Sequence, residues 1–220
     1  MLIVPSKPAS DPNALWLCRI GRWLRNLLVG ACVFVVLLAL LCVGLIESNV
    51  VHGKYPSILR NLAWVLGEQE HVYNFDNVIP GKVFRSGQPD DRFIDYVVRN
   101  YGIRHIITLN GKPPLDDQEA RNLGISSKTY DWDEDNLPTR DEFQQIVRLL
   151  DTETPVLVHC SAGMDRTGYL VAAYRILELG WPVNKALDEM RLYGHEPERN
   201  QLALKYFMQI VARQVSGIGP

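Results

Sequence analysis

The hydrophobic pattern divides the chain into one unbroken apolar segment and a longer region of short alternating periods. Residues 27–46, LLVGACVFVVLLALLCVGLI, contain no charged side chain. Twenty helical residues at about 1.5 Å per residue cover roughly 30 Å, which is the thickness of the hydrocarbon core of a bilayer. The pattern therefore predicts one transmembrane helix over residues 27–46.

The charges on either side of this segment predict its orientation. Arg19, Arg22 and Arg25 precede it, and Glu47 follows it. By the positive-inside tendency, residues 1–26 form a basic cytoplasmic tail and the chain from about residue 48 is exported, to the periplasm or another extracytoplasmic space. A cleaved signal peptide is the alternative, but its apolar stretch is usually shorter and a small-residue cleavage site is poorly represented here.

Residues 47–75 are poorly patterned and are expected to be a connector. Within it, ILRNLAWVLG (residues 58–67) has the spacing of a short amphipathic helix. Its tryptophan and arginine suit a position at the membrane surface, and packing on the following domain is the alternative.

Residues 76–215 show the periods of strands and helices in turn and are expected to form one domain. Apolar runs predict strands at residues 82–86, 104–111, 125–132 and 155–160. Helical spacing predicts helices at residues 89–102, 115–124, 139–151, 166–180, 183–194 and 198–214. Asp90 is expected to be an N-cap, and Thr139 with Glu142 has capping-box spacing. The alternation predicts an α/β fold, a central, mainly parallel β-sheet flanked by helices.

Composition narrows the class of partner. The chain is 47% hydrophobic and 22% charged, which is typical of globular proteins. The formal net charge is −2, and because the N-terminal tail is basic, the remainder is acidic. An acidic domain argues against nucleic acid as a partner. Cys160 is the only cysteine after residue 42, so no second thiol in the exported part can pair with it.

One segment, VLVHCSAGMDRTG (residues 156–168), combines the elements of a phosphate site. A strand that leads through a loop into a helix brings backbone N–H groups and the positive end of the helix toward one point. Cys160 stands at the base of that loop, and this field stabilises its thiolate. Gly163 allows a tight curve, and the planar fork of Arg166 can grip two phosphate oxygens.

The segment VHCSAGMDRTG resembles the signature HC-x2-G-x2-R-[ST] of cysteine-dependent protein tyrosine and dual-specificity phosphatases. The resemblance extends over roughly residues 72–212 and includes FRSGQP (residues 84–89), which is similar to small bacterial members. It implies a dual-specificity phosphatase-like fold and no metal or cofactor.

The resemblance also implies roles for individual residues. Cys160 attacks phosphorus and forms a cysteinyl-phosphate intermediate, and Arg166 stabilises the charge of the transition state. Thr167 stabilises the thiolate, and His159 holds the loop from behind. The phosphate is bound by the loop residues Ser161, Ala162, Gly163, Met164, Asp165 and Arg166.

A leaving oxygen needs a proton, and YDWDEDNLPT (residues 130–139) is the loop expected to supply it. Asp131, Asp133 and Asp135 compete for this role. In related dual-specificity enzymes the acid often stands three residues before a proline, a spacing that Asp135 shares with Pro138. Asp135 is therefore the expected general acid, and Asp133 is the alternative.

Several other residues have structural interpretations. Arg85 and Ser86 are expected to organise loops, and Lys112 is a candidate for the mouth of the pocket. His105 is expected to be a packed core histidine and His195 a loop residue. Tyr169 and Tyr174 are expected to pack on the helix that follows the signature.

The expected substrate is phosphotyrosine in a protein, with phosphoserine and phosphothreonine in a dual-specificity enzyme. A lipid or phosphoinositide phosphatase is the alternative, because CSAGMDR resembles loops of bacterial phosphatases that act on both. Met164 stands where several of those have lysine, which removes a charge that would favour polyanionic headgroups. Two other classes of protein fit the sequence less well. Arsenate reductases of one type need further cysteines, which this domain lacks. A membrane-tethered module that binds phosphate without turnover would usually lack the cysteine, the arginine or the acid.

Overall fold

The computed structural model describes residues 12–47, 55, 57–133, 135–196, 205–209 and 211–212. Its contacts divide the chain into two units, Met1–Ser48 and Asn49–Pro220, and each is described by itself. The first contains helix α1 (Pro12–Glu47). Its stretch Trp23–Leu41 is long and apolar enough to cross a membrane, with a mean hydropathy of 2.4. The helix begins well before the predicted segment, with Pro12 at its first position, where proline costs no hydrogen bond.

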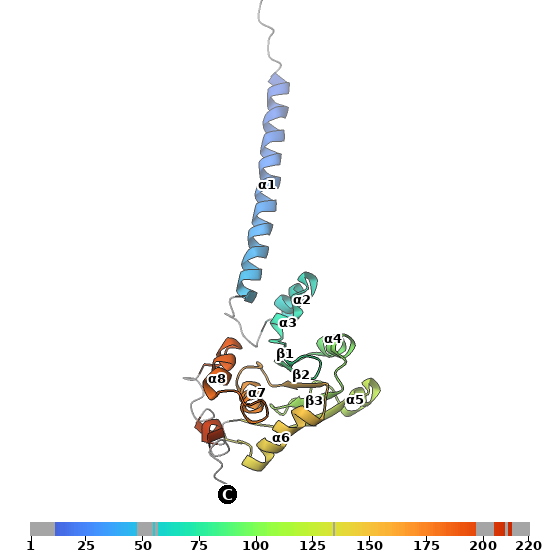
Figure 1. Cartoon of the computed structure of the whole chain (residues 1–220). Coiled ribbons are helices and arrows are strands. Elements are labelled where there is room, and N and C mark those ends of the chain that lie inside the picture. Colours follow the sequence, from blue (N-terminus) through green and yellow to red (C-terminus); the bar gives the residue numbers. More distant parts are fainter. Residues whose placement is uncertain are drawn as a thin grey trace, which may run out of the picture. The chain divides into compact units, whose positions relative to one another are not determined.

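The second unit is an α/β domain (Figure 1). Its helices and strands are α2 (Ser57–Leu66), α3 (Gln69–Val72), β1 (Asp76–Ile79), β2 (Val83–Ser86), α4 (Asp91–Tyr101), β3 (His105–Thr108), α5 (Asp117–Leu123), β4 (Ser126–Thr129), α6 (Arg140–Thr152), β5 (Val156–His159), α7 (Asp165–Leu177) and α8 (Val183–Leu192). Residues 205–209 and 211–212 are helical, and the rest of the last predicted helix lies outside the described residues.

The five strands form one sheet in the order β1-β2-β5-β3-β4. The four strands from β2 to β4 are parallel, and only β1 pairs antiparallel, with β2. This confirms the expected α/β fold with a mainly parallel sheet. Strand β1 and helix α3 are too short to give a period in the sequence, and they were not predicted.

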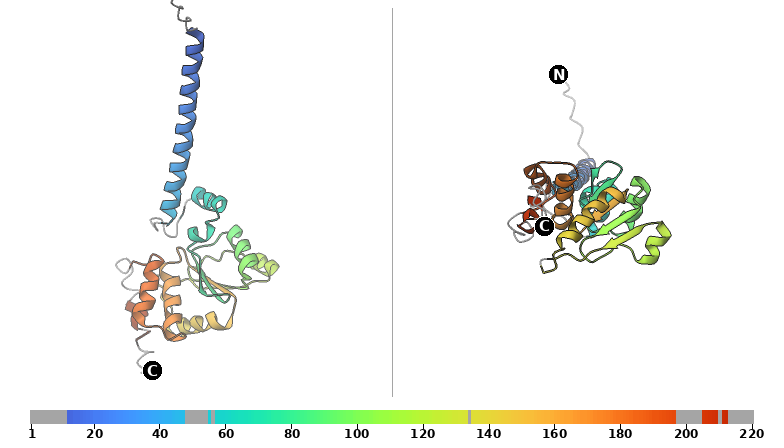
Figure 2. Two further views of the ribbon diagram at one scale, coloured as in Figure 1. Left: turned by 45° about the horizontal axis from the view of Figure 1, so that its top comes forward. Right: turned by 60° about the horizontal axis from the view of Figure 1, so that its bottom comes forward.

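Successive strand residues face opposite sides of the sheet, and both sides are covered (Figure 2). Val83 and Val156 belong to the core shared with α6 and α7. Phe84, one residue on, stacks at 5.8 Å on Phe75, which in turn contacts Phe93 of α4. Strand β5 lies at the centre of the sheet and is buried along its whole length, so its C-terminal end is held firmly from both sides.

Helix boundaries follow the predicted caps. Asp90 accepts a hydrogen bond from the Phe93 N–H at 3.0 Å, and Gly102 ends α4 in the left-handed conformation. Thr139 accepts from the Glu142 N–H at 3.2 Å at the start of α6. These local signals are the part of the fold that sequence reports most directly.

Helix α2 packs on the domain, the second of the two alternatives. Ala63 is fully buried, and the Trp64 ring meets the Tyr96 ring edge-on at 5.5 Å. The guanidinium of Arg92 lies 4.1 Å from the centre of the Trp64 ring. The indole of Trp64 therefore packs against Tyr96 and Arg92, two residues of α4.

The expectation that His105 is a packed core histidine is wrong. Its side chain is 28% exposed, and its Nδ1 lies 3.6 Å from a carboxylate oxygen of Glu153. As the first residue of β3, it is the one residue of this strand that is not buried.

Candidate active site

The signature segment forms the connection from β5 to α7. Cys160 directly follows the last strand residue, and it is 3% exposed and unpaired. Residues 161–164 form the turn, and α7 begins at Asp165. The strand, loop and helix therefore stand in the order that places a thiol at the floor of an anion-binding loop.

The carbonyl groups of this loop are held from outside. The oxygen of Ser161 accepts from the Gln88 N–H at 3.0 Å, and that of Ala162 accepts from Asn74 Nδ2 at 3.1 Å. The oxygen of Gly163 accepts from Nη2 of Arg85 at 2.5 Å. Three consecutive peptide units are thus oriented by donors from other elements.

The N–H groups of the same loop are left free. Within the described ranges, those of residues 161–166 donate to no other group. Such a row of unpaired amides at the beginning of a helix is a site for an anion with several oxygens. Residues 161–166, the segment expected to bind phosphate, therefore have N–H groups without a partner in the described part of the chain.

Gly163 shows why the loop needs glycine at this position. Its φ is +73°, and a Cβ here would lie 2.7 Å from the backbone of Ser86 and Gly87. Both the left-handed conformation and the close approach exclude a side chain. The end of β2 is thereby packed directly against the loop.

Arg85 is the buried donor behind the loop, as expected of a loop-organising residue. It is 1% exposed, and its guanidinium stacks on the Tyr193 ring, 3.6 Å from the centroid. Burial lowers the pKa of Arg85, and the charges around it, including Tyr193, Glu189 and Cys160, oppose that effect. The buried guanidinium thus lies among groups of the signature loop and of α8.

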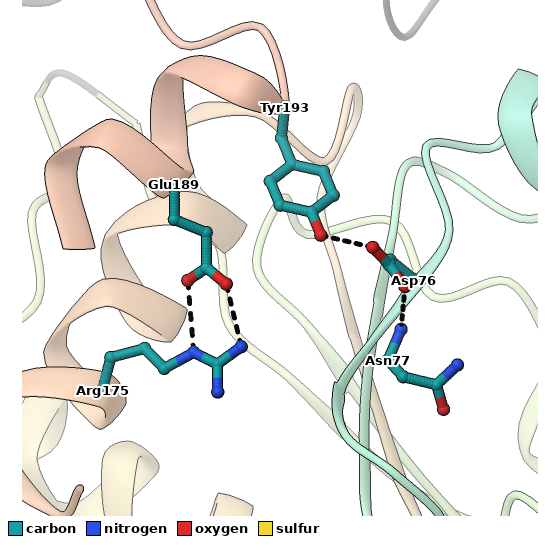
Figure 3. A network of polar contacts seen from close by, with 5 residues as sticks. All are labelled: Asp76, Asn77, Arg175, Glu189 and Tyr193. Carbon is teal, nitrogen blue, oxygen red and sulfur yellow. Dashed lines mark hydrogen bonds and ion pairs between the residues drawn. The ribbon is translucent and has the colours of Figure 1, made fainter. Parts of the chain in front are cut away.

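Two contacts of α8 fix the wall behind Arg85 (Figure 3). Tyr193 donates to Oδ2 of Asp76 at 2.5 Å, which joins the end of α8 to β1. The Arg175 guanidinium donates two hydrogen bonds, of 3.2 and 2.8 Å, to the Glu189 carboxylate, and these bonds join α7 to α8. Asn74 Nδ2 adds a bond to the Tyr193 carbonyl at 3.1 Å.

The side chains of the two remaining signature residues, Arg166 and Thr167, make no hydrogen bond in the described part of the chain. Arg166 is half-buried, and its guanidinium has no hydrogen bond or ion pair with any residue that the structure describes. Thr167 is fully buried, and its Oγ1 has no hydrogen-bond partner in the same part of the chain. Buried hydroxyl groups are normally hydrogen-bonded, so the Thr167 hydroxyl could donate to an acceptor that a ligand brings or that the reaction creates.

His159 lies behind the loop and carries no charge at neutral pH. Its Nε2 is 2.8 Å from Oγ1 of Thr108, on the neighbouring strand β3. Burial lowers the pKa of His159 to about 4. A neutral imidazole with a hydroxyl partner fits the expected supporting role.

His195 is more than the loop residue that the sequence predicts. Its side chain is 2% exposed, and its Nδ1 lies 2.5 Å from Oδ1 of Asp165. The ring also meets Tyr169 edge-on at 5.2 Å. The contact joins the loop after α8 to Asp165, the first residue of α7. Since Asp165 directly precedes Arg166, the contact also restrains the backbone at Arg166.

The loop of three aspartates separates their roles. Oδ1 of Asp133 accepts from the N–H groups of Asp135 and Asn136 at 2.9 and 2.7 Å, so this side chain shapes the turn. The Asp131 carboxylate lies against Gly111, where a Cβ would meet it at 2.5 Å. Asp135 is exposed, and its carboxylate has no partner in the described part of the chain. This arrangement leaves the Asp135 carboxylate free to meet a ligand.

A polar strap joins the signature loop to the neighbouring loops. Asn110 Nδ2 donates to Oγ of Ser161 at 3.1 Å and to Oε1 of Gln88 at 2.9 Å. Gln88 in turn donates through Nε2 to the Lys112 carbonyl at 3.2 Å. Tyr169 and Tyr174 pack in the core, as predicted. In the described ranges, no three His, Cys, Asp or Glu side chains converge as a metal site requires.

The roles of five residues at this site were not predicted from the sequence: Asn74, Gln88, Asn110, Tyr193 and His195. Asn74 has a φ of +50°, which asparagine tolerates better than most residues, and its position before a short strand was a usable turn signal. The side chains of the others bond to residues 22 to 117 positions away in the chain, and no local sequence pattern reports contacts over such separations.

A family model described as "Tyrosine phosphatase family" matches residues 71–216. The chain is 48% identical over 46 residues to Dual specificity protein phosphatase TpbA of Pseudomonas aeruginosa, a match to 21% of each protein. It is 32% identical over 108 residues to the Tyrosine-protein phosphatase CDC14 homolog of Schizosaccharomyces pombe, 48% of this chain and 20% of that protein. The chain thus spans about a fifth of the length of these relatives.

Solved structures share the fold. Two crystal structures of P. aeruginosa TpbA, one in complex with pTyr, match with a TM-score of 0.55 at 23% and 21% identity; they cover 66% and 67% of this chain and 90% and 92% of theirs. PTPMT1 in complex with PI(5)P matches with a TM-score of 0.51 at 20% identity, over 63% of this chain and 97% of that one.

Proposed function

Because the chain belongs to the tyrosine phosphatase family, we propose that it is a phosphoric monoester hydrolase that removes phosphate from phosphotyrosine in proteins. The observation that carries the proposal is the loop above Cys160. Its carbonyls accept from Gln88, Asn74 and Arg85, while its amides have no partner among the described residues. Backbone amides oriented in advance stabilise developing charge without reorganisation.

The first step is transfer of the phosphoryl group to sulfur. The Cys160 thiolate attacks phosphorus, the S–P bond forms, and the P–O bond to the tyrosine breaks. Arg166 and the loop amides bind the three non-bridging oxygens, and Asp135 donates its proton to the leaving phenoxide.

The second step returns the enzyme to its starting state. Water attacks phosphorus and gives its proton to the Asp135 carboxylate, the S–P bond breaks, and the electron pair returns to sulfur. Thr167 donates to the departing thiolate through a hydroxyl that has no other described partner. Phosphate leaves, and no metal takes part in either step.

Phosphotyrosine is supported as the substrate by two observations. TpbA, whose fold this domain shares, has been crystallised with pTyr. The signature loop offers Met164 and Asp165 at its rim, so it adds no cation for a polyphosphorylated headgroup. We extend the proposal to phosphoserine and phosphothreonine as secondary substrates.

The test is hydrolysis of p-nitrophenyl phosphate and of a phosphotyrosine peptide by the full chain in detergent with EDTA present. Turnover that vanishes in Cys160→Ser and is blocked by vanadate supports the proposal. Binding of the peptide without turnover would make the protein a non-catalytic phosphate-binding module. Faster turnover of a phosphatidylinositol phosphate than of any peptide would make it a lipid phosphatase.

We also propose that α1 anchors the domain in a membrane, with residues 1–26 in the cytoplasm and the catalytic domain outside it. The support is the apolar stretch Trp23–Leu41 and the arginines before it. A bacterial alkaline phosphatase reporter fused after residue 50 is expected to be active, since it matures only outside the cytoplasm. An inactive reporter, with a fluorescent cytoplasmic reporter at the same point, would reverse the orientation.

A further inference from the structure

A pocket of about 310 Å³ opens beside the signature loop. Ser161 contributes one wall, and Gln88, Asn110 and Lys112 contribute the side formed by the loops after β2 and β3. Tyr73 and Arg60 close it on the side of α2 and α3. The pocket thus adjoins the loop that is proposed to hold phosphate and shares its first residue, Ser161.

The pocket is joined to the signature loop by hydrogen bonds. Asn110 donates to the Ser161 hydroxyl, and the Gln88 backbone N–H donates to the Ser161 carbonyl. A group bound among Asn110 and Gln88 therefore lies next to the first residue after the nucleophile. A substrate whose phosphate occupies the loop would place its neighbouring groups here.

The charge of the pocket is positive. Arg60 and Lys112 are its charged lining residues, and none of the lining residues is acidic. The Lys112 amino group is exposed and has no ion-pair partner in the part of the chain that the structure describes. Arg60 lies 3.6 Å from Oδ2 of Asp90, at a half-exposed position where such a pair is weak.

One lining residue also has an unsatisfied acceptor. Asn110 is 5% exposed, and its Oδ1 is buried and accepts no hydrogen bond within the described ranges. A buried amide oxygen without a partner favours a ligand that brings an N–H group. A peptide backbone brings one for every residue except proline.

We propose that this pocket is an accessory substrate subsite that binds a carboxylate side chain next to the phosphotyrosine of a protein substrate. The inference rests on the proposed phosphatase function. Lys112, which has no ion-pair partner among the described residues, and Arg60, which Asp90 pairs only weakly, suit a single carboxylate, whereas a polyphosphorylated headgroup would leave several charges unpaired. Arg60 precedes the segment of residues 71–216 that the family model matches.

The test compares two phosphotyrosine peptides that differ only at the flanking positions, with glutamate in one and glutamine in the other. The full chain in detergent is expected to hydrolyse the acidic peptide with about fivefold higher kcat/KM. In the double variant Arg60→Gln and Lys112→Gln this ratio is expected to fall to about one, whatever the absolute rates. Lys82→Gln, an exposed lysine in the turn between β1 and β2, is the matched control and is expected to keep the ratio.

Equal turnover of the two peptides by the wild type would overturn the subsite while leaving the phosphatase intact. A preference for the acidic peptide that persists in the double variant would also overturn the subsite, because residues other than Arg60 and Lys112 would then recognise the flanking glutamates. A short-chain phosphatidylinositol phosphate gives a third arm: faster turnover of this lipid than of the acidic peptide, lost in the double variant, would assign the pocket to a headgroup. If neither peptide nor p-nitrophenyl phosphate is hydrolysed, the proposed function fails and the subsite fails with it.

Discussion

The guanidinium of Arg85 donates to the carbonyl oxygen of Gly163, 78 residues further along the chain. The bond joins β2 to the signature loop at the residue with the left-handed backbone. Asn74 and the Gln88 backbone hold the two preceding carbonyls in the same way. The loop is therefore shaped by the strand and turns beside it as well as by its own glycine.

Replacing Arg85 by alanine is expected to lower kcat/KM about 100-fold, because a loop displaced by about 1 Å no longer presents its amides in the reacting geometry. Arg85→Lys is expected to lie between wild type and alanine, since the amine keeps the charge but loses the planar fork. Steady-state rates on p-nitrophenyl phosphate measure both variants. Arg99→Ala, at an exposed position on α4, is the control and is expected to keep the wild-type rate. If Arg99→Ala were as slow as Arg85→Ala, the loss of activity would reflect general unfolding and not the bond from Arg85 to the loop.

Asn74 allows the donor to be separated from the backbone conformation. Asn74→Gly keeps the φ of +50° without strain but removes the bond to the Ala162 carbonyl, and we expect about a tenfold loss of kcat/KM. Asn74→Asp is expected to be worse, because a carboxylate would then face a carbonyl oxygen. Asn74→Gly at the wild-type rate would show that the loop carbonyl needs no side-chain donor.

The aspartate loop gives a comparison between two isosteric changes. Asp135→Asn is expected to lower kcat on a phosphotyrosine peptide about 100-fold with little change in KM, because the leaving phenoxide loses its proton donor. Asp133→Asn is expected to stay near the wild type, since an amide oxygen can still accept from the N–H groups of residues 135 and 136. The reverse pattern would assign the acid to Asp133.

The stability of the domain is expected to fall as the pH drops from 6.5 to 4. Burial lowers the pKa of His159 from 6.5 to about 4, so in this range the unfolded chain binds a proton that the folded chain does not. The free energy of unfolding should decrease by about 2 kcal/mol between pH 7 and pH 5 from this residue alone. Urea unfolding followed by tryptophan fluorescence measures it.

His159→Gln, which is neutral at both pH values, should lose most of that difference. The exposed His71 is the control, and His71→Gln should keep it. An unchanged pH dependence in His159→Gln would show that His159 is protonated equally in both states.

The sequence predicted those features that depend on residues close together in the chain. Helix α4 is set by its apolar spacing, by Asp90 before it and by Gly102 after it. The loop that contains Cys160 was expected because its thiol, glycine and arginine are neighbours. Both depend on local geometry, which a sequence states directly.

The sequence could not predict which distant groups complete the loop. Asn74 was placed in the connector, yet it bonds to Ala162, 88 residues later. His195 was expected to be an ordinary loop residue, yet it reaches Asp165 from the end of α8. These pairs arise only when the sheet brings β1, β2 and β5 together with α8, and that order is not encoded in any one segment.

The central claim is that the sulfur of Cys160 receives the phosphoryl group, and rapid-quench mass spectrometry tests it most directly. The full chain is mixed with p-nitrophenyl phosphate, quenched in acid within milliseconds, digested and examined for the peptide that contains residue 160. We predict an adduct of one phosphate on Cys160, and none in Cys160→Ser quenched in the same way. Continued turnover by Cys160→Ser, or an adduct on another residue, would contradict the account.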